Sequence, residues 1–228
     1  MFFAWPLNPK FYSFPARIHN HKAVIACEEA RSKKQELKTI ESGLALGESA
    51  SKYTVPAIHH VPTNTYIMDS VPISQFIEAT YPEKPVHLTS ELGKQIEAQA
   101  RPAIGPVVRI SVTPRELNIL SPRAQEFFRR TREAALGHPL EDLLDPQKEE
   151  EAWNAVGDGM RALGELMRTN KAEGPFVLGA QPSITDFFVA GLLQMIKTVD
   201  EGIFEKMVPY PGFKDIYEAC QPYMEKRD

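Results

Sequence analysis

The stretch that decides the fold runs from Lys52 to Pro82 and reads KYTVPAIHHVPTNTYIMDSVPISQFIEATYP. Its first part, Tyr53–His59, is rich in β-branched and aromatic residues. A turn around Asn64 separates it from a second apolar run, Tyr66–Met68. Two short runs of this composition on either side of a turn predict a β-hairpin.

A helix is predicted directly after the hairpin. The apolar residues Ile73, Phe76 and Ile77 recur at the i, i+3, i+4 spacing of one helix face. We expect Ser70 to be the N-cap, because serine oxygens accept hydrogen bonds from the first free N–H groups. Pro72 is tolerated in the first turn, and Pro82 is expected to end the helix.

Two dipeptides in this stretch suggest a binding site. A cis Val55–Pro56 bond would turn the N–H and C=O of Val55 outward, where a peptide-like ligand could pair with them as an added strand. The helix start at Ser70 offers free N–H groups to a carboxylate, and Asp69 could hold an ammonium group. The pattern therefore favours a ligand with peptide backbone at one end and a free amino acid at the other.

The run Tyr-Thr-Val-Pro-Ala-Ile, then Asp-Ser, then Ala-Thr-Tyr-Pro resembles the glutathione-binding half of the cytosolic glutathione transferases, most closely the fungal etherase-like class. The resemblance implies that Val55 and Pro56 hold the cysteinyl backbone of glutathione. It also implies that Asp69 and Ser70 hold the γ-glutamyl end, and Lys52 is assigned to the same cofactor site.

The composition is that of an ordinary globular protein: 228 residues, 43% hydrophobic and 25% charged. A net charge of −4 gives no electrostatic footprint for nucleic acid or for an anionic membrane. Cys27 and Cys220 form no disulfide framework, and the opening MFFAWPLNP has no basic leader, so we expect a cytoplasmic protein. No metal site is expected, because no histidines have zinc-ligand spacing and His59 and His60 would point to opposite faces of a strand.

The chain is expected to form two domains. Lys10–Phe14 is a predicted strand and His21–Glu29 a predicted helix, so residues 1–84 form an α/β, thioredoxin-like domain in which glutathione binds. After the prolines at 82 and 85 the strand signals disappear, and residues 89–228 are expected to form an all-helical substrate-binding domain. This is the glutathione transferase fold that the resemblance implies.

Several helices are predicted in the second domain. One starts at Ser90, and Pro102 and Pro106 are expected to bend or break it. Another has Ser121 as its N-cap and runs to Gly137. Its sequence, SPRAQEFFRRTREAALGHPLEDL, again resembles the etherase-like class.

The same domain contains a stripe of apolar side chains that recur every three or four residues, as on one face of a helix, and we interpret this stripe as core. Its members are Trp153, Val156, Met160, Leu163 and Met167. Ser183 and Asp186 have the spacing of a capping box and are interpreted as structural, at the start of a buried helix over 184–196. A last helix is predicted over 213–223.

A glutathione transferase must hold the tripeptide's thiol as a thiolate, since the thiolate is the nucleophile. The donor is expected near Ser13, Arg17 and Asn20, with His19 as a candidate base. The serine and tryptophan that the etherase-like class carries here have no counterpart, although Lys22 matches its lysine. The thiolate donor therefore stays open among these residues.

The resemblance implies a homodimeric enzyme that conjugates glutathione to a bulky apolar electrophile, in fungal secondary metabolism or detoxification. The electrophile pocket would be lined from Ala103 to Ile119. Cis–trans isomerisation by reversible thiol addition and ether cleavage are alternative reactions. A non-catalytic glutathione or ligand carrier is the alternative that follows from the missing family serine.

Overall fold

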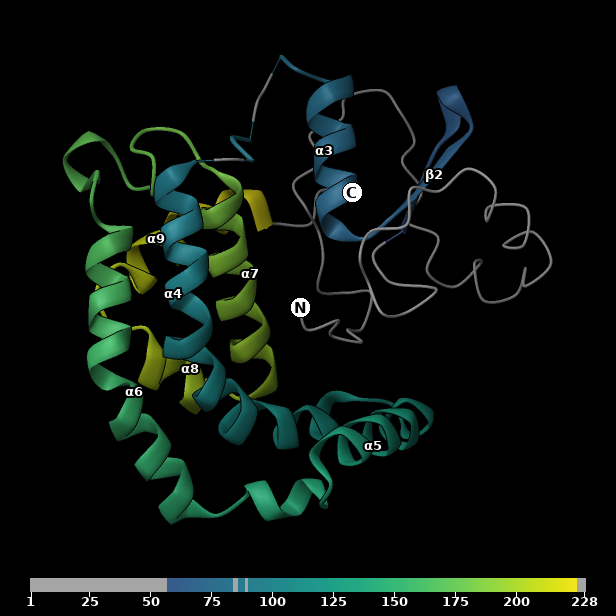
Figure 1. The fold of residues 1–228 in the computed structure, drawn as a ribbon, viewed down its shortest axis with the longest axis vertical. Coiled ribbons are helices and arrows are strands. Elements are labelled where there is room, and N and C mark those ends of the chain that lie inside the picture. Colours follow the sequence, from purple (N-terminus) through teal and green to yellow (C-terminus); the bar gives the residue numbers. More distant parts are fainter. Residues whose placement is uncertain (1–56, 84–85, 89, 225–228) are drawn as a thin grey trace. The chain divides into compact units, whose positions relative to one another are not determined.

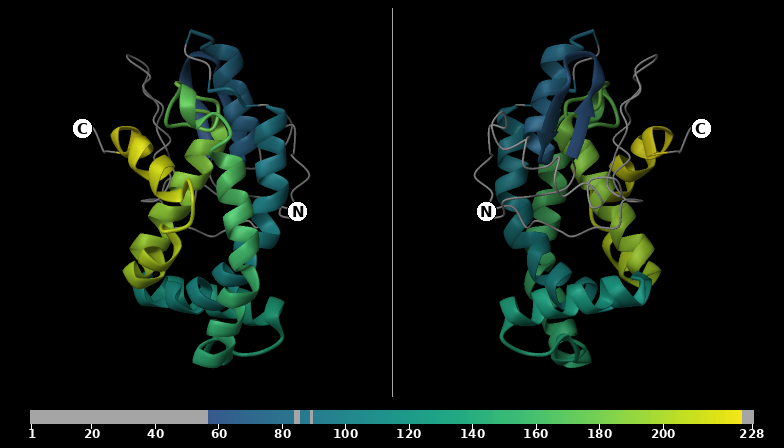
Figure 2. Two further views of the ribbon diagram at one scale, coloured as in Figure 1. Left: turned by 90° about the vertical axis from the view of Figure 1, so that its left-hand side faces the viewer. Right: turned by 90° about the vertical axis from the view of Figure 1, so that its right-hand side faces the viewer.

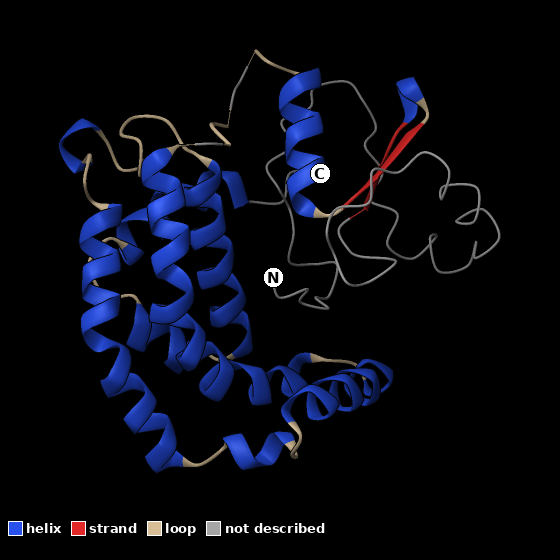
Figure 3. Ribbon diagram, in the orientation of Figure 1, coloured by secondary structure: helices blue, strands red, loops and turns tan. Residues whose placement is uncertain are grey.

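The computed structural model describes residues 57–83, 86–88 and 90–224. The chain divides into two compact units, and the division falls between Leu88 and Thr89. Figure 1 shows the helices and strands along the chain, and Figure 3 separates them by type.

The described part of the first unit begins with an antiparallel hairpin, as predicted. Strand β1, Ala57–His60, pairs with strand β2, Thr65–Met68, in a register that places His59 opposite Tyr66 and His60 opposite Thr65. A short 3-10 turn, η2 (Val61–Thr63), connects them and ends on Asn64, which has φ of 49°. Asparagine tolerates this left-handed conformation, which explains why the turn lies there.

Helix α3, Ser70–Thr80, follows the hairpin and contacts both of its strands. Ile73 is 5% exposed and Ile67 of β2 is 9% exposed, so these two side chains form the centre of the interface. The helix ends at Tyr81, whose N–H donates to the carbonyl of Ile77, directly before Pro82. The predicted N-cap is wrong by one residue: Asp69 is the N-cap and Ser70 is the first helical residue.

The second unit is helical throughout its described residues. Its elements are α4 (Glu91–Val107), η3 (Val108–Val112), η4 (Thr113–Ile119), α5 (Pro122–Leu136), η5 (Leu140–Leu143), α6 (Pro146–Met167), η6 (Lys171–Glu173), α7 (Ile184–Val199), α8 (Glu201–Met207) and α9 (Phe213–Met224). Helix α4 packs along α6, and α7 packs against α8 and α9. Figure 2 shows this bundle from two further sides, with α5 across its end.

The sequence predicted that Pro102 and Pro106 bend or break helix α4; neither proline breaks it, so the predicted break is wrong. The helix continues to Val107, and only there does the backbone change to the wider π-helical turn η3. A proline removes one N–H donor but leaves the side chains around it free to pack. Ala103 and Val107 are 6% and 0% exposed, so packing in the bundle holds this segment helical.

The other helix boundaries and caps predicted for this unit agree with the structure. Helix α5 has Ser121 as its N-cap and ends at Gly137, which has φ of 78°. The apolar stripe on α6 is buried along its length, with Met160 at 0% exposure. Ser183 and Asp186 form the capping box of α7, and the last helix covers the predicted residues 213–223. One helix was not predicted, α8, which starts on Asp200, the residue that ends α7.

Candidate functional site

The start of α3 has a strained backbone at Asp69. This residue has φ of 74° and ψ of 142°, a combination that glycine adopts freely and side-chain-bearing residues rarely do. Such a conformation costs about 1–3 kcal/mol and persists only where the surrounding structure imposes it. Strained residues of this kind cluster at ligand-binding positions. The outlier therefore marks the β2–α3 junction as a candidate site.

The Asp69 side chain does not cap the helix that it begins. Aspartate at an N-cap normally accepts a hydrogen bond from the first turn, but here no such bond forms. The carboxylate instead accepts a 3.3 Å hydrogen bond from the hydroxyl of Ser70. The carboxylate therefore satisfies none of the N–H groups of the first turn.

The first turn of α3 consequently offers free donors. The first helical hydrogen bond runs from the Ile73 N–H to the Asp69 carbonyl at 3.1 Å, and Pro72 has no N–H. Within the described part of the chain, the N–H groups of Ser70 and Val71 meet no acceptor. Val71 is 46% exposed, so this turn reaches the surface.

The arrangement can bind opposite charges side by side. Free N–H groups at a helix N-terminus favour an anion, while the Asp69 carboxylate favours a cation. An amino acid carries both charges on neighbouring atoms, as an α-carboxylate and an α-ammonium group. The start of α3 is therefore suited to the free amino-acid end of a ligand.

The other predicted site residues lie outside the residues that the structure describes. These are Ser13, Arg17 and Asn20 for catalysis and Lys52, Val55 and Pro56 for cofactor binding. Ala57, where β1 begins, is the first described residue after them. Of the predicted site residues, Asp69 and Ser70 are thus the two whose geometry is known.

Sequence patterns gave no sign of a hydrogen-bond chain at the other end of α3, around His60. The His60 ring lies within 2.7 Å of the Thr63 hydroxyl through Nδ1 and within 3.0 Å of the Tyr81 hydroxyl through Nε2. His59 has its own bond, 3.0 Å to Asn64, and its ring stacks on Tyr66 at 4.1 Å. The two histidines therefore lie on opposite faces of the strand, as their alternation predicts.

The helical segment from Ala103 to Ile119 was predicted to line an electrophile pocket. Its buried side chains, Val107 and Val112 among them, belong to the helical core. Pro106, Arg109 and Asn118 are its exposed residues. These three are the positions from which the segment could reach a ligand.

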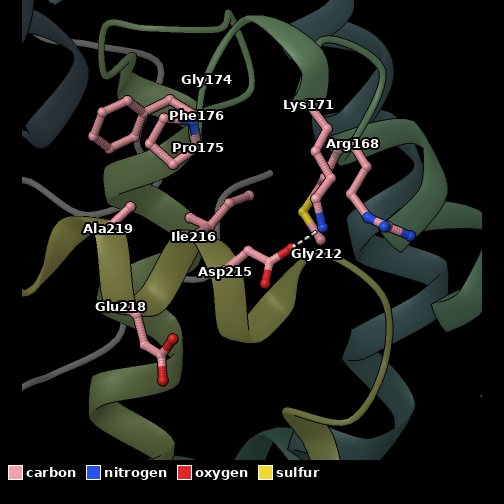
Figure 4. A pocket seen from close by; sticks show the side chains of 11 residues that line it. Arg168, Lys171, Gly174, Pro175, Phe176, Gly212, Asp215, Ile216, Glu218 and Ala219 are labelled. Atoms are coloured by element: carbon pink, nitrogen blue, oxygen red, sulfur yellow. Dashed lines mark hydrogen bonds and ion pairs between the residues drawn. The ribbon is translucent and has the colours of Figure 1, made fainter.

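A pocket of about 450 Å³ lies within the helical unit, beside α9 and the loop after α6. Figure 4 shows its apolar side, with Pro175 and Phe176, and the facing side chains of Lys171 and Asp215. These two charges are joined at 2.9 Å, and both side chains are about half exposed, at 52% and 46%. Among the described residues that line the pocket there is no serine, cysteine or histidine, and its ionisable side chains are those of Arg168, Lys171, Asp215 and Glu218.

The described residues lack two further features. They contain no group of three or more histidine, cysteine, aspartate or glutamate side chains placed to hold a metal ion. None of the helices described has the length and apolar character needed to cross a membrane.

Comparison with known families gave one match to a family model. The model describes the C-terminal domain of glutathione S-transferases and matches residues 93–206, half of the chain. The matched range extends from the first turn of α4 into α8. The glutathione S-transferase-like protein ustS of Aspergillus flavus is 27% identical over 191 residues, which cover 76% of this chain and 68% of that protein.

Solved structures agree with this match. A glutathione transferase of Phanerochaete chrysosporium superposes with a TM-score of 0.68 and 25% identity, covering 85% of this chain and 80% of that one. A glutathione S-transferase of Ceriporiopsis subvermispora, crystallised in complex with glutathione, gives a TM-score of 0.68 and 27% identity over 85% and 81% of the two chains. The likeness confirms the predicted fold class, a thioredoxin-like domain followed by an all-helical domain.

Proposed function

This chain belongs to the glutathione S-transferase family, and on that premise we propose that it binds glutathione at the start of α3 and transfers the tripeptide's thiol to an apolar electrophile. Residues 1–84 would form the glutathione-binding domain and residues 89–228 the substrate-binding domain. A relative crystallised with glutathione supports the choice of cosubstrate.

The observation that carries the proposal is an aspartate at the start of α3 that does not cap its helix. The γ-glutamyl end of glutathione has an α-carboxylate, which would accept from the N–H groups of Ser70 and Val71. It also has an α-ammonium group, which would donate to the Asp69 carboxylate. Hydrogen bonds to charged groups contribute about 1.5–3 kcal/mol each, enough to anchor one end of the tripeptide.

The remaining contacts are assigned from sequence. Lys52, Val55 and Pro56 directly precede β1, and we propose that they hold the cysteinyl part of glutathione. Antiparallel pairing of the Val55 backbone with the ligand would place the cysteine between the γ-glutamyl anchor and the reacting electrophile.

The thiol must then be held as a thiolate. An unperturbed thiol has a pKa of about 8.5, so only a few per cent is ionised at neutral pH. Lowering that pKa by about two units ionises most of it and requires about 2.7 kcal/mol of differential stabilisation. A hydrogen bond from Ser13, Arg17 or Asn20 is our proposed source, with the exposed residues between 103 and 119 contacting the electrophile.

Binding and activation of glutathione are tested together by titration. Calorimetry measures the dissociation constant for glutathione, and ultraviolet thiolate absorbance of the complex measures the thiol pKa. We expect binding, with the pKa of the bound thiol lowered. Binding with an unshifted pKa would instead indicate the carrier, which the missing family serine motivates.

The reaction itself is tested with limiting glutathione. Conjugation forms a carbon–sulfur bond and consumes one glutathione per product, whereas isomerisation adds the thiolate to a conjugated alkene and then expels it unchanged. Mass spectrometry of the products decides between them, because turnover beyond one equivalent excludes stoichiometric conjugation. Release of an alcohol or phenol together with a glutathione adduct would identify ether cleavage.

The assembly and setting of the enzyme are part of the same proposal. We propose a cytoplasmic homodimer that acts in secondary metabolism or detoxification, since the relatives named above come from fungi. Size-exclusion chromatography with light scattering of the full chain measures the oligomeric state, and a mass near 51 kDa is about twice the 25.6 kDa of one chain.

A further inference from the structure

His60 connects the hairpin to the far end of α3. It is the last residue of β1, and its Nε2 lies 3.0 Å from the hydroxyl of Tyr81, the residue that ends α3. Its ring meets Phe76 of α3 edge-on, with the centroids 5.0 Å apart. On the other side, Nδ1 lies 2.7 Å from the Thr63 hydroxyl in the hairpin turn. One side chain thus contacts the turn, the strand and the helix.

The direction of these hydrogen bonds follows from their last acceptor. The hydroxyl of Thr65 donates to the carbonyl of Thr63 at 3.3 Å, and a hydroxyl has one hydrogen to donate. In the arrangement that uses this carbonyl, Thr65 accepts from the Thr63 hydroxyl, 2.8 Å away, and Thr63 accepts from Nδ1–H of His60. In the same arrangement the Nε2 atom of His60 accepts from the Tyr81 hydroxyl.

In this arrangement the chain of donors runs in a single direction, from the end of α3 to the hairpin turn. Each of its hydroxyl hydrogens has an acceptor. A continuous chain of this kind is stronger than its isolated bonds, because each donor polarises the next.

The opposite end of α3 carries the proposed binding site. The helix has eleven residues and rises about 1.5 Å per residue, so it is a rod about 16 Å long. A rotation of about 4° at the Tyr81 end displaces the first turn by about 1 Å, and a displacement of that size is enough to disturb a ligand's hydrogen bonds. At its start, one residue in a strained conformation, Asp69, joins the helix to β2.

We propose that His60 is a positioning residue for glutathione: by holding the end of α3 on the hairpin, it orients the N–H groups of Ser70 and Val71 and the Asp69 carboxylate at the other end. This inference rests on the proposed function, since it concerns the same ligand. His60 itself does not touch the ligand in this scheme.

The chain offers a matched control in His59. It is the neighbouring residue, it has the same side chain, and its Nε2 also makes a 3.0 Å hydrogen bond, to Asn64. That bond stays within the hairpin and does not reach α3. Loss of either imidazole can therefore change the stability of the hairpin. An effect on glutathione binding that is transmitted through α3 is expected only from His60.

The test measures the glutathione dissociation constant of full-length variants by calorimetry, with Tm recorded in parallel. Tyr81→Phe removes the hydroxyl that contacts His60. His60→Asn keeps a polar atom near the position of Nδ1 but has none at the position of Nε2, so it loses the contact to Tyr81. Both are expected to weaken glutathione binding about three- to tenfold, the value of one hydrogen bond. His60→Gln, whose amide reaches the position of Nε2, should restore binding to within about twofold of wild type.

The outcomes separate this inference from the proposed function. His59→Asn, which removes the Nε2 contact to Asn64 as His60→Asn removes the one to Tyr81, should leave the dissociation constant within about twofold of wild type. If Tyr81→Phe and His60→Asn lower Tm but leave the dissociation constant unchanged, His60 is merely structural and the inference is wrong. If wild-type protein itself fails to bind glutathione, the proposed function falls, and this inference falls with it.

Discussion

Helices α3 and α7 begin with the same two residue types, a serine and an aspartate, arranged to opposite effect. At α7, the Asp186 carboxylate is fully buried and accepts hydrogen bonds from the Ser183 N–H and the Val177 N–H, each 2.8 Å long. It also accepts from the Ser183 hydroxyl at 2.6 Å. At α3, the Asp69 carboxylate is partly exposed and accepts from one neighbouring hydroxyl at 3.3 Å.

The difference lies in the backbone. Ser183 has extended angles, with φ of −117°, which let the third residue of the helix reach back to the N-cap N–H. Asp69 has φ of 74°, and its carboxylate accepts no hydrogen bond from the first turn of the helix. Residue type alone therefore does not separate a structural helix start from the start that we propose as a binding site. Satisfied donors indicate stability, whereas unsatisfied donors with local strain indicate a ligand.

The largest effect is expected from Asp186→Ala. Removing this carboxylate leaves the N–H groups of Val177 and Ser183 buried without an acceptor, which destabilises the protein by about 4 kcal/mol. For a chain of this size the Tm should fall by about 8–16 °C. Urea denaturation measures the change, and Asp186→Asn serves as the isosteric control. A loss below about 1 kcal/mol would show that the capping box is not a stabilising element.

Asp69→Gly should change stability and binding in opposite directions. Glycine relieves the strain at φ of 74°, so the free energy of unfolding should rise by about 1 kcal/mol. The lost carboxylate should weaken glutathione binding about tenfold. Asp69→Asn isolates the charge, since asparagine tolerates positive φ and should weaken binding without stabilising the fold. A destabilised Asp69→Gly variant with normal affinity would contradict our account of this position.

Smaller effects are expected from substituting the serines at the two helix starts, Ser183 of α7 and Ser70 of α3. Ser183→Ala removes a buried hydroxyl from the capping box and should destabilise the protein by about 1 kcal/mol. Ser70→Ala should change stability by less than about 0.5 kcal/mol, because the hydroxyl caps nothing. Its effect should appear instead as an affinity for glutathione about threefold weaker. Equal losses of stability in the two variants would remove the distinction between the two helix starts.

The smallest expected effect is on the reactivity of the Cys220 thiol, whose pKa is raised in part by the negative charge of Asp186 at the start of α7. Burial raises the pKa of its thiol to about 12 from the ordinary 9.0, and the negative charge of Asp186 adds to the rise. Because the folded state holds this proton more tightly, its contribution to stability is complete below pH 9.0 and is lost as the pH rises toward 12.

Alkylation in a Cys27→Ser background measures this difference. At about pH 9 we expect native Cys220 to react with iodoacetamide far more slowly than the unfolded chain does. Asp186→Asn should increase the native rate only slightly, because burial is the larger cause. Equal native and unfolded rates would show that the thiol is accessible.

Predictions from local sequence were accurate where local contacts decide the structure. The hairpin followed from two short β-rich runs around Asn64, and the α5 boundaries followed from Ser121 and Gly137. The errors have identifiable causes. Pro102 and Pro106 did not break α4, because packing in the bundle outweighed two missing hydrogen bonds. Helix α8 was missed because its seven residues are too few for an apolar period to be recognised.

The candidate site was predictable only in part. Asp69 and Ser70 were identified as a pair, but the N-cap was assigned to the wrong member. Nothing in the letters Asp-Ser shows that the backbone is strained or that the carboxylate accepts no hydrogen bond from the first turn of the helix. The link between His60 and Tyr81 was not predicted at all, since 21 residues separate them and neither belongs to a motif.

The sequence by itself determined the hairpin and helix over residues 57–80, the apolar stripe of α6 and the capping box of α7. These depend on periodicity and on residues within one helical turn of each other, which are close together in any chain that folds locally. Only the tertiary structure decided that Asp69 leaves its helix uncapped and that His60 holds the far end of α3. Both depend on how α3 packs against the hairpin, and that packing brings together residues whose separation in sequence carries no signal.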